Sequence, residues 1–99
     1  MWIMVNNEKA QTIMIQLSTM KPGDKGIVHE ITVDGTAESL LVAERLREMG
    51  FGEGLNLEVR HDSPFGRDPM VVKVGDMLVA LRRKEATQII IAIASEAAA

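Results

Sequence analysis

The chain has 99 residues, enough for one domain with a modest core but not for two lobes with a substrate cleft between them. It contains no cysteine, which excludes disulfides, thiolate metal sites and thiol nucleophiles. With 11 Lys and Arg against 14 Asp and Glu, it lacks the basic field typical of nucleic-acid-binding proteins, so we expect no nucleic-acid partner.

Residues 1–16 differ in character from the rest and are interpreted as an N-terminal extension. Their apolar run is too short to span a bilayer and has no positive residue before it, so neither membrane insertion nor a signal peptide is expected. The extension either adds an edge strand or stays partly mobile. We expect a cytoplasmic protein.

An amphipathic helix is predicted from its expected cap, Thr36, to about Met49. Its apolar residues, Leu46 among them, recur every three to four positions, which is the period of one buried helix face. Gly50 follows directly and can adopt the left-handed conformation that closes a helix. Phe51 comes next and is predicted to pack in the core.

Short strands surround this helix in the sequence. Gly75-Asp76 separates two of them by the spacing of a tight hairpin, and residues 82–86 are predicted to form one helical turn. We therefore expect a mainly β fold, a small, partly open barrel of about five antiparallel strands, with one α-helix after the first barrel strand and the helical turn before the last. The strands are expected at residues 26–32, 55–60, 70–74, 77–81 and 88–93.

The predicted helix presents a candidate docking surface. If its apolar period faces the core, Leu40 and Leu41 lie on the opposite side, beside Glu44 and Arg47. An apolar spot rimmed by charges has the composition of an interface, although isolated exposed leucines are also common on surfaces that bind nothing. We predict that this face contacts a partner protein or a second copy of the chain.

A basic cluster at Arg82, Arg83 and Lys84 is the second docking candidate, suited to an acidic surface. The alternatives are a solvated turn or a structural Arg82 that anchors Glu85 or a backbone carbonyl.

Catalytic chemistry finds no support in the sequence. There is no Gly-x-Ser-x-Gly elbow and no phosphate-binding glycine loop, so we expect neither an enzyme nor a bound cofactor. His29, His61 and Asp62 are weak metal-ligand candidates, because only two imidazoles are present and no third convergent ligand is evident. We favour the interpretation that they are polar residues on the outer face of the sheet.

One ordered set of residues runs through most of the chain: Leu17, Met20, Pro22-Gly23, Arg45-Leu46, Met49-Gly50, Gly54, Pro64-x-Gly66, Asp68-Pro69, Ala80-Leu81-Arg82, Glu85-Ala86 and Ile89. Of these and their neighbours, Gly23, Leu46, Met49, Gly50, Phe51 and Gly54 are assigned structural roles. Over Leu17 to about Ile91, this set resembles the ferrous iron transport protein A (FeoA) family. The resemblance implies an SH3-like barrel, expected here over residues 17–94, with 95–99 as a frayed tail. It further implies a cytoplasmic accessory of FeoB, a ferrous iron permease with a cytosolic GTP-binding domain.

The sequence departs from the family pattern at Arg67, which interrupts the usual Gly-Asp-Pro run. A related SH3-like module forms the C-terminal domain of some iron-dependent repressors, so a metal-responsive regulatory module is an alternative function, as is a self-associating interaction domain. The absence of a helix-turn-helix region favours the transport accessory.

Overall fold

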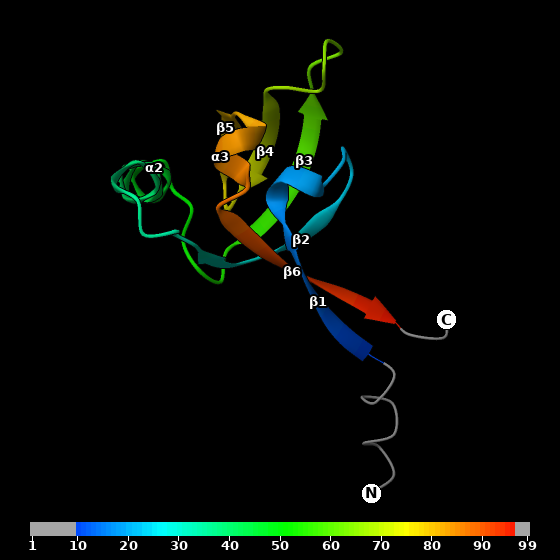
Figure 1. The fold of residues 1–99 in the computed structure, drawn as a ribbon. Helices are drawn as coiled ribbons and strands as arrows, with labels where there is room; N and C mark the ends of the chain where they lie inside the picture. The colour runs from blue at the N-terminus through cyan, green and yellow to red at the C-terminus, as the bar shows by residue number, and fades with distance from the viewer. Residues whose placement is uncertain (1–9, 97–99) are drawn as a thin grey trace, which may run out of the picture.

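The structure is a computed structural model that describes residues 10–96, so expectations for residues 1–9 and 97–99 lie outside the described residues. It is mainly β with one main helix, as the sequence predicts (Figure 1). Within residues 10–96, no helix has the length and apolarity needed to cross a membrane. The elements are β1 (Ala10–Gln16), η1 (Leu17–Thr19), β2 (Lys25–Ile31), α2 (Ala37–Glu48), β3 (Asn56–Asp62), β4 (Met70–Val74), β5 (Met77–Leu81), α3 (Arg83–Ala86) and β6 (Ile89–Glu96).

The described strands join one antiparallel sheet in the order β1-β6-β2-β3-β4-β5. This sheet has six strands where about five were predicted, because β1 pairs along its length with β6. The added strand lies in the N-terminal extension, for which an edge strand was one of the two alternatives. In Figure 1, β1 and β6 run together away from the rest of the sheet, and the β3–β4 loop lies at the opposite end.

Two register shifts bend the sheet. One lies in β2 between Val28 and Glu30, and the other lies in β3 between Val59 and His61. Such irregularities locally increase strand twist, which helps a short sheet curl around one core.

The core fills the inside of this curled sheet. In β4, Met70, Val72 and Val74 are buried while the residues between them are only half-buried, as expected for a strand with one face inward. Phe51 is 1% exposed and Leu46 is fully buried, which confirms that both are core residues.

Both ends of α2 are built as the sequence predicts. The Thr36 hydroxyl accepts a hydrogen bond from the backbone N–H of Ser39 at 3.1 Å, which caps the first turn. At the other end, Gly50 has φ +112° and the N–H of Phe51 donates to the carbonyl of Leu46 at 3.1 Å. This left-handed glycine closes the helix and returns Phe51 to the core.

The tight hairpin and the helical turn are also confirmed. Val74 pairs directly with Met77, so Gly75 and Asp76 form a two-residue loop, with φ +57° at Gly75. The short helix α3 then spans the residues at which a single turn was predicted.

Candidate docking surfaces

The first candidate surface lies on α2. Leu40 is 50% exposed and Leu41 65% exposed, and both Glu44 and Arg47 beside them are exposed. The helical period predicted this arrangement from the sequence. These four residues are called the α2 surface below.

The opposite face of α2 attaches the helix to the domain. Leu46 and Ala43 are buried there. Two ion pairs also link α2 to the α3 region, Arg45 to Glu85 at 3.6 Å and Lys84 to Glu38 at 3.9 Å. Because these pairs are largely solvent-exposed, apolar burial contributes most of the attachment.

The start of α2 is fixed by a small polar network. The Asp34 carboxylate accepts hydrogen bonds from the Thr36 hydroxyl at 2.6 Å and the Thr36 N–H at 2.9 Å. These hydrogen bonds lower the pKa of Asp34 to about 2, and the bond from the Thr36 hydroxyl has the largest effect. The Gln88 amide donates to the carbonyls of Ser39 and Thr32, which ties this end of α2 to the start of β6.

The basic cluster after β5 divides into two kinds of residue. The side chains of Arg82 and Lys84 are 66% and 87% exposed, whereas that of Arg83 is only 19% exposed. For Arg82 it is the backbone N–H, not the guanidinium, that bonds the Glu85 carboxylate, at 2.9 Å.

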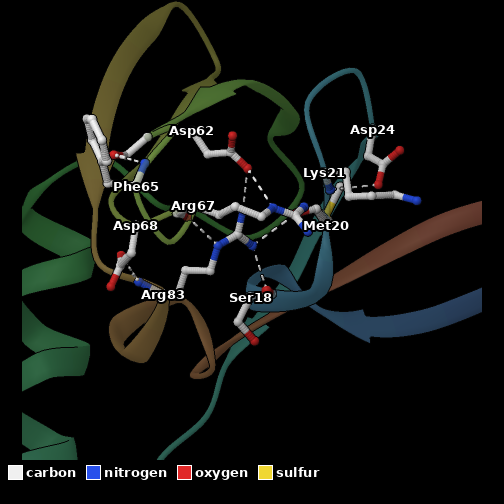
Figure 2. Close-up of polar contacts among 10 residues, drawn as sticks. Ser18, Met20, Lys21, Asp24, Asp62, Phe65, Arg67, Asp68 and Arg83 are labelled. Carbon is white, nitrogen blue, oxygen red and sulfur yellow. Dashed lines mark hydrogen bonds and ion pairs between the residues drawn. The ribbon is translucent and has the colours of Figure 1, made fainter.

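Arg83 does not match the docking role expected for it, because its guanidinium donates hydrogen bonds to groups of its own domain. It donates to the backbone carbonyls of Ser18 at 2.7 Å, Met20 at 3.0 Å and Arg67 at 2.8 Å. It also donates to the Asp62 carboxylate at 2.9 Å, so one side chain ties η1, β3 and the β3–β4 loop together (Figure 2). The structural arginine of the cluster is therefore Arg83.

The most exposed large apolar side chain of the described residues was not predicted from the sequence. Phe65, in the loop between β3 and β4, is 86% exposed. The signal was present in its neighbours, since an aromatic residue between Pro64 and Gly66 sits in a turn from which the core is difficult to reach.

The weak metal-ligand candidates do not converge. The β2–β3 ladder runs from Lys25 paired with Glu58 to Ile27 paired with Asn56, so His61 lies beyond one end of it and His29 beyond the other. Asp62 instead accepts hydrogen bonds from two arginines. Among residues 10–96, no three His, Asp or Glu side chains come together in a way that could hold a metal ion.

The residues assigned structural roles occupy turns or the core. Gly23 and Gly54 donate backbone hydrogen bonds to the carbonyls of Val59 and Val28, each at 2.8 Å, so both turns are fastened to neighbouring strands. Met49 packs, partly buried, against the core.

The fold defines the class of this protein as a small SH3-like β-barrel domain. The sequence model of the FeoA domain matches residues 15–93, most of the chain. The chain belongs to the FeoA family. A comparison with curated protein sequences gives no match.

Solved structures agree with this assignment. An iron uptake regulatory protein (FeoA) has a TM-score of 0.66 at 27% identity, covering 82% of this chain and 100% of its own. The FeoA of Stenotrophomonas maltophilia in complex with zinc, described as a procaryotic SH3 domain protein, has a TM-score of 0.66 at 29% identity and covers 85% of this chain and 99% of its own.

A manganese-dependent transcriptional repressor is also similar, with a TM-score of 0.67 at 21% identity over 82% of this chain and 42% of the repressor. At this identity the likeness shows a shared fold alone.

Proposed function

We propose that this chain is a non-enzymatic, cytoplasmic accessory protein of ferrous iron uptake that binds the cytosolic part of a FeoB-type permease. Membership of the FeoA family supports the link to iron uptake. The observation that carries the binding function is the α2 surface. Two adjacent leucines are exposed there, on a helix whose opposite face is already packed against the core.

The α2 surface has the composition of a small interface. Its centre is the apolar pair Leu40 and Leu41, and its rim is formed by Glu44 and Arg47, which are charged and exposed. Apolar centres with polar rims are typical of protein–protein contacts. The leucines contribute little to folding because their side chains remain solvated, so partner binding can use them without a change in the fold.

Such a domain acts on its partner through differential affinity. If the chain binds one conformation of the permease more tightly than another, it shifts the permease toward that conformation and thereby changes its assembly or its GTP turnover. No group of this chain needs to touch the nucleotide.

A pull-down tests this function. The full chain is immobilised and offered the purified cytosolic portion of the permease from the same organism, alongside the double variant Leu40→Ser/Leu41→Ser. We expect capture by the wild type and strong loss with the double variant.

Leu78→Ser provides the matched control, because Leu78 is 66% exposed, close to the 65% of Leu41, but lies on β5. Capture should survive this change. Absence of capture by the wild type contradicts the proposed function, whereas equal capture by the double variant contradicts only the assignment to α2.

A further inference from the structure

The β3–β4 loop presents an aromatic side chain that the fold does not use. Phe51 is 1% exposed in the core, whereas Phe65 is 86% exposed. Figure 2 shows the Phe65 ring pointing away from the Asp62–Arg83 cluster. A solvent-exposed aromatic ring contributes almost nothing to folding, yet aromatic residues, Phe included, are enriched in protein interfaces.

The loop that carries Phe65 is fastened at its base. The N–H of Ser63 donates to the carbonyl of Pro69 at 3.1 Å, which closes the two ends on each other. The N–H of Phe65 donates to the Ser63 hydroxyl at 3.1 Å, which fixes the backbone at the aromatic residue.

The other half of the loop is fastened by Arg83. Its guanidinium donates to the carbonyl of Arg67 at 2.8 Å, and its backbone N–H donates to the Asp68 carboxylate at 2.9 Å. Arg67, which interrupts the family's Gly-Asp-Pro run, has φ +62° and donates to Asp62 at 3.2 Å. The loop is thus held in one shape before any partner arrives, which lowers the ordering cost of binding.

The hollow at Gly66, the residue after Phe65, is lined by cationic side chains. Its volume is about 330 Å³, and its lining contains three cationic residues, Lys21, Arg67 and Arg83, and no carboxylate. The nearby Asp62 is only 14% exposed and accepts hydrogen bonds from both arginines through a single oxygen. One mostly buried carboxylate facing two guanidinium groups leaves net positive charge at this hollow.

We infer that Phe65, Arg67 and Lys21, called the loop surface, form a second docking surface that takes an acidic protein surface. Phe65 enters an apolar socket of the partner, and a partner Asp or Glu carboxylate enters the hollow beside Arg67 and Lys21. The inference rests on the proposed function and identifies the matching partner surface as an acidic one on the cytosolic part of the permease.

A protein fits these observations better than a lipid surface. Stable membrane association needs more than one inserted apolar group, and the loop offers a single aromatic ring.

The test measures the dissociation constant between the full chain and the purified cytosolic portion of the permease by biolayer interferometry. Phe65→Ser should weaken binding about tenfold or more while the melting temperature stays unchanged. Phe65→Leu should retain affinity within about threefold, since a large apolar side chain is kept. Arg67→Glu should weaken binding most at low salt.

The outcomes separate this inference from the proposed function. If the wild type does not bind, both are overturned. If the wild type binds and Phe65→Ser binds equally well, only the loop surface is overturned. A parallel arm uses vesicles of phosphatidylserine and phosphatidylcholine, and Phe65-dependent sedimentation together with Phe65-independent permease binding also overturns it, in favour of a lipid surface.

Discussion

The α2 surface and the loop surface both expose apolar side chains, but they hold them in place in different ways. On α2, Leu40 and Leu41 face water because the helical period turns Leu46 toward the core. In the β3–β4 loop, Phe65 faces water because a hydrogen bond donated by Arg83 to Arg67 and one accepted by the Ser63 hydroxyl from Phe65 fix the backbone around it. The first surface depends on local periodicity, and the second depends on contacts between residues far apart in the chain.

The largest effect should come from Leu46→Ala. This change removes the fully buried anchor of α2 and leaves a cavity, so we expect a loss of about 2–5 kcal/mol in the free energy of unfolding. Leu41→Ser on the other face of the same helix should change it by less than about 0.5 kcal/mol. Urea denaturation measures both. Similar losses for the two variants would contradict the assignment of inner and outer faces.

The second largest effect is expected for Arg83→Ala. It removes the guanidinium donor of the Ser18 and Met20 carbonyls and leaves the Asp62 carboxylate with Arg67 alone, which should cost about 2–3 kcal/mol. Arg83→Lys should retain only part of the lost stability, because the Lys ammonium group cannot reproduce the several fixed donors of the planar Arg guanidinium.

The same pair of variants tests whether Arg83 holds the loop. Hydrogen exchange at the N–H groups of Ser63 and Phe65 should accelerate in Arg83→Ala relative to the α2 amides. Uniform acceleration across the domain would show that Arg83 stabilises the fold as a whole and does not specifically hold the loop surface.

A smaller effect is expected for Gly50→Ala at the end of α2. Gly50 has φ +112°, and an added Cβ would approach the Met77 Cε atom to 2.5 Å. Backbone strain of this kind costs about 1–3 kcal/mol. Gly35→Ala gives the comparison, since Gly35 also has positive φ but has open space around it. Because the Met77 Cε atom ends a flexible side chain that is 48% exposed and can move aside, thermal unfolding should show losses of similar size for the two variants, and a clearly larger loss for Gly50→Ala would mean that Met77 cannot move away.

The smallest effect is expected for Asp34, and it is detected mainly in the pH dependence of stability. Hydrogen bonds from Thr36 lower the pKa of Asp34 from 3.8 to about 2 in the folded state. Its ionised form therefore contributes stability that is complete above pH 3.8 and is lost as the pH falls through about 2. Asp34→Asn should melt slightly below the wild type at neutral pH, with the difference disappearing in acid. A constant difference down to pH 2 would contradict this role.

The sequence predicted what depends on local patterns. Thr36, Gly50 and the apolar period between them defined α2 with its caps, and Gly75-Asp76 defined the hairpin. The two leucines of the α2 surface followed from the same period. These features need information from only a few neighbouring residues.

The sequence could not show which arginine of the basic cluster is structural. Arg82 and Arg83 are adjacent and chemically identical, and only the fold brings Ser18, Asp62 and Arg67 to Arg83. The loop surface was missed for the same reason, because the hydrogen bonds from Arg83 that hold it span 15 to 21 residues.

One measurement tests the central claim, that this chain works by docking through side chains that its fold does not need. It is a calorimetric titration of the cytosolic portion of the permease with the full-length wild type and with Leu40→Ser/Leu41→Ser, each sample also being melted. We predict saturable binding by the wild type, and about tenfold weaker binding by the double variant at an unchanged melting temperature. No saturable heat with the wild type, or a double variant that loses affinity only because it unfolds, would contradict the account.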